Sequence, residues 1–551
     1  MQRLRRWPRI TAIKHGVGWV MMSLPSQVPL LAHSRGLGTY FALLAVACLS
    51  ACSPTPLPTP LDSAQSSSQP AHPTTSAGSN VHTANDAYVG SSTCGSCHAD
   101  AYALWQGSHH QMAMSVVDGT DATFRGEQAT FDTGVVRFSR DDSGYVITLD
   151  PDGAAPTDLR VRYAFGVHPL QQYLVAIGDG RMQALPFVRD TRPLGSEPYR
   201  TGVQGQAWYH LDHVSSASDS EANVTHWMRD GQNWNHMCAD CHSTNVRKSY
   251  DAQSDRFTTQ FSEISVGCEA CHGPGQGHSH QPKRVTMPAL DRQQKADVCA
   301  SCHSRRTRLL EGFQPGDRYL DYFSPALLDA DLYHADGQIL DEVFVYGSFA
   351  QSKMHGAGVT CGNCHEPHSG QLLLPGNDMC TSCHSPAGNP QFPSLTKALY
   401  NDSTHHFHLP KAGMSAEESG VACVSCHMTG KPYMGVDFRR DHSFRVPRPD
   451  LSAATAAPDA CTSCHQDRGA EWAAKAIADH KNSSRSEHFG PAFALARRAK
   501  KGAESQLVDI AGSFDMPAIV RGSALSLLAA YPQQLTALAK GAADADPLVR
   551  L

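Results

Sequence analysis

The sequence predicts a mainly helical chain with long irregular loops, organised around eight copies of one short cysteine motif. The motif is Cys-x-x-Cys-His, and it recurs between Cys94 and His465. After the first copy comes a stretch without motifs, in which apolar and polar residues alternate between turns, as in antiparallel strands. The C-terminal segment has apolar residues at helical spacing. We therefore expect six parts, at residues 1–51, 52–86, 87–119, 120–212, 213–468 and 469–551.

Each motif has the groups that covalent attachment of a c-type haem requires. Two thiols form thioethers to the haem vinyl groups, and the adjacent imidazole is placed under the iron. This composition would produce about 0.03 copies by chance. Zinc ribbons and disulfides also use Cys-x-x-Cys, but neither needs a histidine after every second cysteine. The sequence therefore predicts eight c-type haems with their iron as cofactors.

The predicted attachment residues are Cys94, Cys97, Cys238, Cys241, Cys268, Cys271, Cys299, Cys302, Cys361, Cys364, Cys380, Cys383, Cys423, Cys426, Cys461 and Cys464. The predicted proximal iron ligands are His98, His242, His272, His303, His365, His384, His427 and His465. Of the 18 cysteines, only Cys48 and Cys52 lie outside the motifs.

The first 51 residues are predicted to be a lipoprotein-type signal peptide. Residues 37–51 are apolar and uncharged, follow Arg35, and are short for a membrane span. The sequence Leu49-Ser-Ala-Cys52 resembles the bacterial lipoprotein signal, which implies that Cys52 is lipidated. Cleavage elsewhere or a retained N-terminal anchor are the alternatives. Export agrees with the motifs, since c-type haem is attached outside the cytoplasm, so we expect a periplasmic, outer-membrane or cell-surface location.

Residues 52–86 are predicted to be a disordered tether. They are rich in Pro, Ser, Thr and Ala, and such a segment cannot bury enough apolar surface to fold. The whole chain is 41% apolar, and its formal net charge is −6 before the haem propionates are counted. We therefore expect redox proteins as partners and a membrane contact through the lipid, but no nucleic acid.

The first motif is followed by a predicted helix at residues 101–105 and then by Ser108-His109-His110. This arrangement resembles the first haem unit of multihaem cytochromes of the c-552/c-554 type. The resemblance implies that His110 is a distal iron ligand, with His109 as the fallback. The alternative is that both are solvated polar residues at a helix end.

Two later segments carry related resemblances. Residues 268–275, with His278 nearby, resemble the same c-552/c-554 type and make His278 a distal candidate. Asp441-His-Ser-Phe444 resembles a segment of related multihaem reductases and electron carriers, which makes His442 another. The overall resemblance covers about 88 to 551, is specific at the motifs and loose elsewhere.

Residues 120–212 are predicted to form an antiparallel β subdomain. The segments 135–138, 145–149 and 159–163 alternate apolar and polar residues, and residues 141–144 and 150–153 have the composition of turns. Shielding of haem edges is the simpler role, and partner docking is the alternative. Three histidines here are expected to be structural: His168, His210 and His213.

Seven motifs follow closely from Cys238, so their haems are expected to be neighbours that exchange electrons. Eighteen histidines outside the motifs lie between His109 and His488, enough for eight bis-histidine haems. The cluster at 405–408 is expected to supply one ligand. The distal candidates are His110, His226, His278, His334, His368, His406, His442 and His355, with His488 as the alternative to the last.

Two imidazoles saturate the iron and favour electron carriage over catalysis, so no catalytic residue is assigned. Catalytic octahaem enzymes that convert nitrite, hydroxylamine or tetrathionate resemble the chain in haem number, and some have a motif ending in lysine. All eight motifs here end in histidine. A terminal oxidoreductase with one open haem remains the alternative, and Tyr346 and residues 353–355 are where its substrate site is expected. A polymeric cytochrome wire is the third hypothesis.

Residues 469–551 are predicted to be helical. Residues 517–521 and 547–550 share a Pro followed by Val-Arg, which resembles the start of HEAT-like repeats; an ordinary helical tail is the alternative. Because the second copy stops at Leu551 within an apolar face, we expect more repeats to follow and to offer a partner-binding surface.

Overall fold

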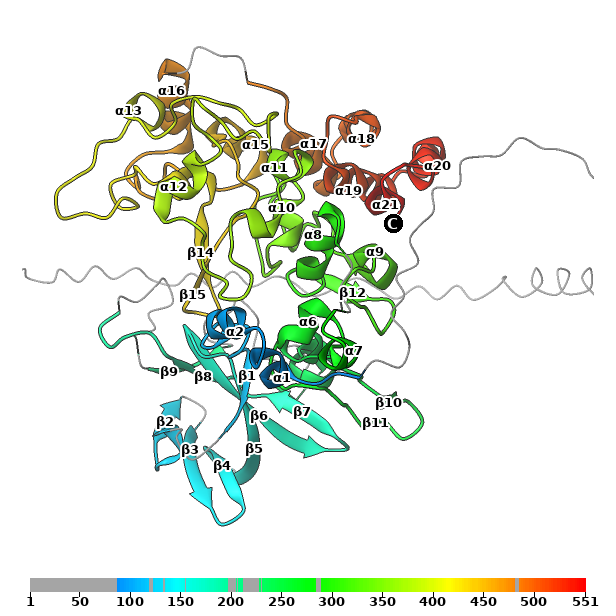
Figure 1. The fold of residues 1–551 in the computed structure, drawn as a ribbon. Helices are drawn as coiled ribbons and strands as arrows, with labels where there is room; N and C mark the ends of the chain where they lie inside the picture. Colours follow the sequence, from blue (N-terminus) through cyan, green and yellow to red (C-terminus); the bar gives the residue numbers. More distant parts are fainter. Residues whose placement is uncertain are drawn as a thin grey trace, which may run out of the picture. The chain divides into compact units, whose positions relative to one another are not determined.

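An antiparallel sheet occupies the stretch between the first two motifs (Figure 1), as the alternating sequence predicts. The computed structural model describes residues 87–117, 122–131, 134–153, 155–196, 205, 207–211, 227–228, 230–283, 289–480 and 485–551. The predictions for the signal peptide, Cys52, the tether, His213 and His226 lie outside these residues. Within the described ranges, no helix has the length and apolarity needed to cross a membrane.

The strands of the sheet are β1 (Met114–Val116), β2 (Gln128–Phe131), β3 (Gly134–Asp141), β4 (Gly144–Pro151), β5 (Thr157–Phe165), β6 (Leu170–Gly178), β7 (Arg181–Ala184), β8 (Phe187–Asp190) and β9 (Trp208–His210). The main order is β2-β3-β4-β5-β6-β8-β9, while β1 pairs with β5 and β7 with β6. Every pairing is antiparallel. Consecutive strands joined by short turns account for most of this order.

The register of the sheet follows from the side chains that it buries. Phe138 lies opposite Ile147 in the β3–β4 pair, and both side chains are buried. The sheet curls so that its first and last strands meet. The ring of Phe131 in β2 lies 4.9 Å from the ring of Phe187 in β8 and 6.2 Å from that of His210 in β9. His210 therefore packs among aromatic side chains. The turn at 141–144 is closed by the Asp141 carboxylate, which accepts from the Ser143 N–H at 2.8 Å.

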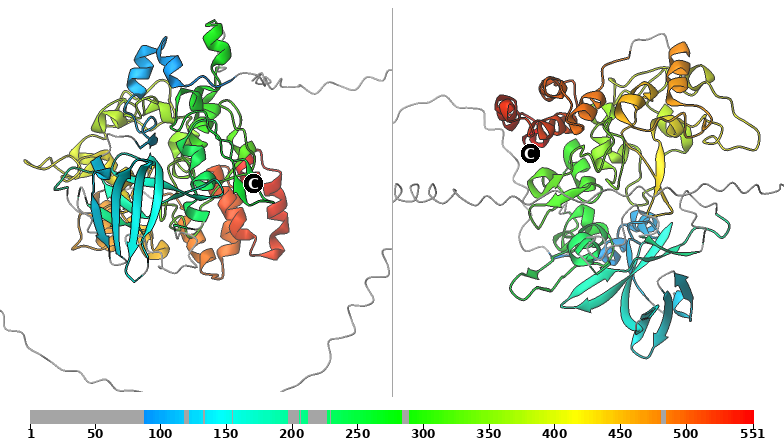
Figure 2. Two further views of the ribbon diagram at one scale, coloured as in Figure 1. Left: turned by 90° about the horizontal axis from the view of Figure 1, so that it is seen from below. Right: turned by 180° about the vertical axis from the view of Figure 1, so that it is seen from behind.

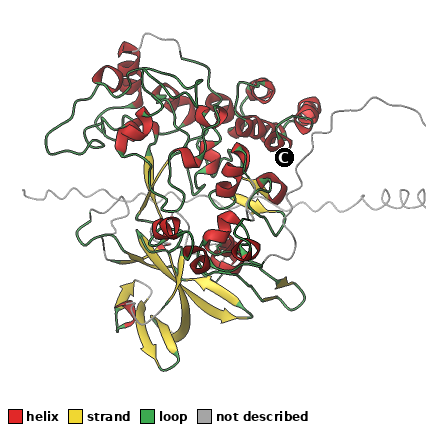
Figure 3. Cartoon of the chain, in the orientation of Figure 1, coloured by secondary structure: helices red, strands yellow, loops and turns green. Residues whose placement is uncertain are grey.

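Outside the sheet the elements are short and joined by loops (Figure 3). The helices up to the last motif are α1 (Ser91–Gly95), α2 (Ala99–Trp105), α4 (Trp234–Met237), α5 (Ala239–His242), α6 (Cys268–His272), α7 (Gln276–His280), α8 (Arg292–Ala300), α9 (Tyr319–Tyr322), α10 (Tyr346–Phe349), α11 (Lys353–Gly356), α12 (Gly376–Thr381), α13 (Ser403–His406), α14 (Cys423–His427) and α15 (Ser452–Thr455). Three two-stranded sheets pair β10 (Tyr250–Asp251) with β11 (Arg256–Phe257), β12 (Arg306–Arg308) with β13 (Phe323–Pro325), and β14 (Gly430–Tyr433) with β15 (Asp437–Arg440). The 3-10 turns are η1 (Ala122–Phe124), η2 (Asp230–Gln232), η3 (Cys361–Asn363), η4 (Pro449–Leu451) and η5 (Pro532–Gln534).

The β14–β15 hairpin connects the sheet to the seventh motif. The Tyr209 hydroxyl of β9 donates to the Met434 carbonyl at 2.7 Å, and Val188, Tyr209 and Val436 share a buried cluster. Burial raises the pKa of Tyr209, so the phenol stays a donor. The sheet therefore contacts the segment that leads from the seventh motif to Asp441.

The C-terminal helices are α16 (Ala470–His480), α17 (Gly490–Arg497), α18 (Ala503–Gly512), α19 (Ala518–Leu528), α20 (Leu535–Ala542) and α21 (Pro547–Arg550). They appear in orange to red, with α18, α19 and α20 side by side (Figure 2). Phe493, Leu507 and Ile519 are buried in one core with Tyr333 and Val343 of the motif region. The two Pro-led segments begin α19 and α21, where proline lacks only an N–H that a helix start leaves unpaired.

Candidate haem-binding sites

Each motif folds as a single helical turn. The histidine N–H donates to the carbonyl of the first cysteine, at 2.9 Å for His98 and Cys94 and at 2.8 Å for His303 and Cys299. This turn places the two thiols and the imidazole on one side, because residues three and four apart are neighbours on a helix. All sixteen motif thiols are free of disulfides. The motifs therefore have the thiols and the geometry for thioether attachment of a c-type haem.

Five motif histidines face a histidine from elsewhere in the chain across a gap of similar size. An iron bonded to two imidazole nitrogens at about 2 Å separates the ring centroids by about 6 Å. The observed centroid distances are 6.0 Å for His98 and His278, 6.1 Å for His303 and His110, 6.2 Å for His272 and His368, 6.2 Å for His427 and His405, and 6.1 Å for His465 and His408. The side chains therefore fit bis-histidine iron at these five motifs.

His442 lies within electrostatic range of His365 of the fifth motif. Burial and, to a smaller extent, the charge of His365 lower the pKa of His442. Asp441 holds this segment in place, because its carboxylate accepts from the N–H groups of Ser443 at 2.8 Å and Ile339 at 3.2 Å. The Asp-His-Ser-Phe sequence thus has a structural explanation: the buried aspartate orders the turn that presents the imidazole.

The second ring nitrogen of several of these histidines is hydrogen-bonded in a way that leaves Nε2 free. Nδ1 of His442 lies 3.0 Å from the Arg440 carbonyl, and Nδ1 of His427 lies 2.6 Å from the Arg445 carbonyl. A carbonyl can only accept, so Nδ1 carries the proton and Nε2 keeps its lone pair for a metal. Burial also lowers the pKa of His303 to about 4, so its imidazole is neutral, as ligation requires.

The histidine cluster at 405–408 differs from the expectation. His405 and His408, rather than His406, lie opposite motif histidines, so two rings of the cluster, and not one, face a motif. Nδ1 of His406 instead accepts from the His408 N–H at 3.3 Å. Sequence reasoning missed this because the αL conformation of Phe407, which ends α13, separates His408 in direction from its neighbours.

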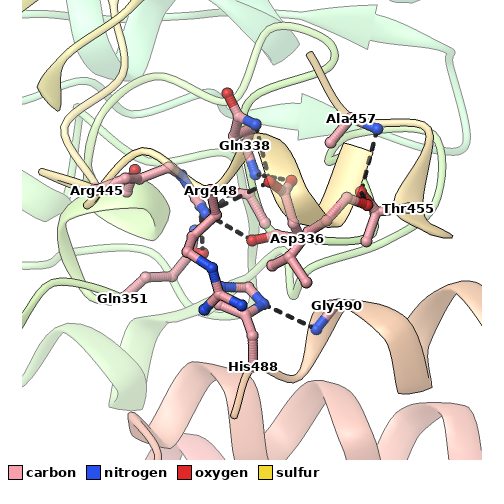
Figure 4. A network of polar contacts seen from close by, with 12 residues as sticks. Asp336, Gln338, Gln351, Arg445, Arg448, Thr455, Ala457, His488 and Gly490 are labelled. Atoms are coloured by element: carbon pink, nitrogen blue, oxygen red, sulfur yellow. Dashed lines mark hydrogen bonds and ion pairs between the residues drawn. The ribbon is translucent and has the colours of Figure 1, made fainter. Parts of the chain in front are cut away.

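The remaining candidates have other neighbours. The ring of His355 lies 5.3 Å from that of Phe349, and the backbone N–H of His334 donates to the Gln338 carbonyl at 2.8 Å. Nδ1 of His488 accepts from the Gly490 N–H at 3.0 Å, which leaves the proton on Nε2 (Figure 4). His109 is exposed, whereas His110 faces His303.

Two motif histidines contact other aromatic rings. His242 lies 4.6 Å from Phe165 of β5, with the rings edge to face. His384 lies 6.1 Å from Tyr400, which also contacts His405 at 4.9 Å. The sheet thus reaches the second motif directly through Phe165.

Arg445 joins the loop of His427 and His442 to Asp336 and Gln351; Figure 4 shows Arg445 beside the last two. Its backbone carbonyl accepts from His427, and its guanidinium donates to the Asp336 carbonyl at 2.7 Å and the Gln351 amide oxygen at 3.1 Å. These partners lie about a hundred residues earlier in the sequence. The network fixes the two imidazoles relative to the fifth motif, which follows Gln351.

A buried carboxylate with three cations lies beside the second motif. Asp240 is 3.0 Å from Arg308, 3.7 Å from Lys248 and 3.9 Å from Arg306. The Arg306 guanidinium also contacts the Cys241 sulfur at 3.5 Å. The cluster carries net positive charge, which near an iron centre favours its reduced, less positive form.

Cysteines and histidines of different motifs lie close to each other. The thiols of four pairs lie close enough for one member to raise the pKa of the other, namely Cys94 and Cys268, Cys241 and Cys302, Cys299 and Cys361, and Cys380 and Cys423. Three further pairs are close enough for one charge to raise the pKa of the other thiol, namely Cys271 and Cys302, Cys364 and Cys383, and Cys426 and Cys464. Pairs of motif histidines indicate three of the same neighbours. The charge of one histidine lowers the pKa of the other for His98 and His272 (motifs 1 and 3), His242 and His303 (motifs 2 and 4), and His384 and His427 (motifs 6 and 7). Two of these links also show direct contacts, since the Cys268 N–H donates to the Ser91 hydroxyl beside the first motif at 2.9 Å and the Cys241 thiol to the Cys302 carbonyl at 3.7 Å. Together the contacts indicate the spatial series 1-3-4-5-6-7-8, with motif 2 beside motif 4.

Comparisons with known proteins agree with this chemistry. The family model of cytochrome c554 and c-prime matches residues 93–138 and 197–273, which contain the first three motifs. The crystal structure of the outer cell wall cytochrome OcwA is similar with a TM-score of 0.50 and 18% identity, over 81% of this chain and 99% of that chain. An undecaheme cytochrome from the S-layer of Carboxydothermus ferrireducens aligns with a TM-score of 0.37 and 18% identity, over 81% and 66% of the two chains.

No curated protein sequence matches the chain. The likeness to OcwA shows a multihaem cytochrome fold, and the family match at the first three motifs supports c-type haem as the cofactor.

Proposed function

We propose that the protein carries eight c-type haems and relays electrons between redox proteins of a respiratory chain outside the cytoplasm. The observation that carries this proposal is the set of opposed imidazoles about 6 Å apart. Iron held between two imidazoles has no free position for a substrate and changes only its oxidation state. Five motifs have such pairs, with His278, His368, His110, His405 and His408 as the distal ligands of motifs 1, 3, 4, 7 and 8. His442, which lies within electrostatic range of His365, is the distal ligand that we assign to motif 5.

The spatial series of motifs supports a relay with two ends and one branch. The first and eighth motifs each adjoin one neighbour, whereas the fourth adjoins the second, third and fifth. Electrons that enter at one end would therefore pass through the fourth site on the way to the other. The second site, beside the cationic cluster around Asp240, is a branch and not a step in the path.

Export and anchoring complete the proposal. The apolar segment 37–51 and Cys52 support a lipid-anchored protein on the periplasmic side, the outer membrane or the cell surface. OcwA, whose fold is similar, is an outer cell wall protein. The C-terminal helices, with α19 and α21 in contact, support a repeat-like surface for a protein partner.

A terminal oxidoreductase is the second candidate, and it rests on the second and sixth motifs. Their histidines contact Phe165 and Tyr400, so the ligation of these two sites distinguishes the two functions. Phe165 is apolar and would favour a site that excludes water, whereas the hydroxyl of Tyr400 could donate to a bound anion. His226, His334 and His355 are the remaining ligand candidates from the sequence for these sites.

Electron paramagnetic resonance of the redox-poised holoprotein tests the proposal. We expect only low-spin ferric signals, because paired imidazoles give a strong ligand field. A high-spin ferric signal together with turnover of nitrite or hydroxylamine would contradict a pure relay. The same spectrum recorded at a series of potentials counts open and saturated irons in one experiment.

A further inference from the structure

One short loop supports three haem sites at once. Residues 365–371 form a tight turn, in which the Glu366 N–H donates to the Gln371 carbonyl at 2.9 Å and the Gly370 N–H to the Glu366 carbonyl at 2.8 Å. The loop begins with the proximal histidine of the fifth motif. Three residues later, His368 faces His272 of the third motif. Between them, the Pro367 carbonyl hydrogen-bonds His110, which faces His303 of the fourth motif.

The loop also gives His368 an unusual hydrogen-bond partner. Nδ1 of His368 lies 2.8 Å from a carboxylate oxygen of Glu366, whose other oxygen accepts from the Ser369 N–H at 2.7 Å. Both side chains are partly shielded, at 36% exposed for His368 and 26% for Glu366. Nδ1 of His408 and of His442 is instead bonded to the backbone carbonyls of His406 and Arg440, and the His110 ring is bonded to the carbonyl of Pro367. The distal imidazole of the third site thus has a charged carboxylate as its partner, where these others have neutral carbonyls.

A carboxylate that accepts the Nδ1 proton makes an imidazole more electron-rich than a neutral carbonyl does. An electron-rich ligand stabilises the oxidised iron more than the reduced iron, which lowers the reduction potential. We propose that Glu366 is a positioning and tuning residue that lowers the reduction potential of the haem held between His272 and His368. The inference rests on the proposed function insofar as it requires haem at this site.

The position of the site gives this effect a consequence for the relay. The third motif adjoins the first through Cys94 and Cys268, and the fourth through Cys271 and Cys302. A haem of low potential at this point is an uphill step between the first site and the rest of the series. Glu366 therefore controls how readily electrons pass between the N-terminal end and the fourth site.

Replacement of one charge tests the inference on the full-length holoprotein. Glu366→Gln keeps an oxygen that can accept from Nδ1 but removes the charge. We expect the midpoint potential of one haem to rise, with the other potentials, the haem content and the low-spin state unchanged. The measurement is a redox titration followed by optical and electron paramagnetic resonance spectra. His368→Met identifies the haem, since its signal must be the one that Glu366→Gln moves.

Glu418 provides a matched control. Its carboxylate also accepts from a serine backbone N–H, that of Ser415 at 2.8 Å, and it is exposed without an imidazole partner. Glu418→Gln should therefore leave every potential unchanged. Glu366→Asp keeps the charge on a shorter side chain. The midpoint potential of the haem between His272 and His368 should therefore change less in Glu366→Asp than in Glu366→Gln. This variant decides the matter if the glutamine variant loses a haem.

Three outcomes would overturn the inference. They are an unchanged potential in Glu366→Gln, an equal shift of all the haems, and a spectrum that His368→Met does not alter. None of them bears on whether the protein relays electrons, because the titration uses the isolated holoprotein. Conversely, a high-spin haem elsewhere with substrate turnover would end the pure relay proposal and leave the shift at the third site intact.

Discussion

A histidine can ligate iron only through a ring nitrogen that its hydrogen bonds leave free, so the polar partner of each imidazole separates ligands from structural histidines. His442 donates from Nδ1 to a carbonyl, whereas Nδ1 of His488 and His406 accepts an N–H. The sequence shows only that histidines are abundant. Whether Nδ1 of a histidine donates or accepts a hydrogen bond depends on the backbone turn around that histidine.

The cluster at 405–408 yields a prediction at this scale. His408→Ala should convert the haem of the eighth motif from low-spin to high-spin, because it removes the imidazole opposite His465. His406→Ala is the matched control from the same cluster and should leave the spin state unchanged. Electron paramagnetic resonance of the two holoproteins measures this difference. The reverse pattern, with a high-spin haem only in the His406 variant, would contradict the assignment.

At the scale of elements, short helical turns carry the attachment chemistry and longer elements position them. The sheet contacts the second motif through Phe165 and, through Tyr209, the hairpin that follows the seventh motif. The C-terminal helices share a core with Tyr333 and Val343. The motif turns are local, so the sequence predicts them well. Which turn packs against which strand depends on contacts between residues far apart in the chain.

The contact between α19 and the segment before α21 gives a prediction on stability. Arg521 and Asp544 form an ion pair whose side chains are only 7% and 10% exposed. Asp544→Asn should destabilise this region by about 3 kcal/mol, since it leaves a buried guanidinium without its carboxylate. Hydrogen exchange of residues 518–551 should speed up accordingly.

Asp479→Asn is the control for this pair, because Asp479 bonds Lys475 on the surface of α16 with both side chains more than half exposed. The destabilisation caused by Asp479→Asn should stay below about 0.5 kcal/mol.

The hydrogen bond from Arg521 lowers the pKa of Asp544 in the folded protein. The stabilisation is therefore present above the unfolded pKa of about 4 and is lost as the pH falls through the lower folded value. Equal exchange in the two variants would refute the buried pair.

At the scale of the whole molecule, the series of motifs differs from their order in the sequence. The third motif stands between the first and the fourth, and the second stands to the side of the fourth. Consecutive motifs are therefore neighbours from the third onward but not at the start of the chain. The β sheet is inserted between the first and second motifs in the sequence, and in the structure the third motif lies beside the first.

Removal of single attachment sites tests this series. Replacement of Cys461 and Cys464 by serine should remove one haem from the end of the series and disturb only the seventh site. Replacement of Cys299 and Cys302 should disturb the second, third and fifth sites together, because the fourth motif adjoins all three. Mass spectrometry counts the haems, from an expected eight to seven, and redox titration locates the disturbed potentials. Equal effects of the two removals would contradict the branched series.

The sequence alone determined the attachment chemistry, since two cysteines and a histidine at fixed short spacing act within one helical turn. It also determined the β insertion and the helical C-terminal segment, because each has a regular period of apolar residues. Only the tertiary structure decided which distant histidine faces each motif, that His405 and His408 both do so, and that Glu366 bonds His368. These relations join residues up to two hundred positions apart, and no local pattern records such a contact.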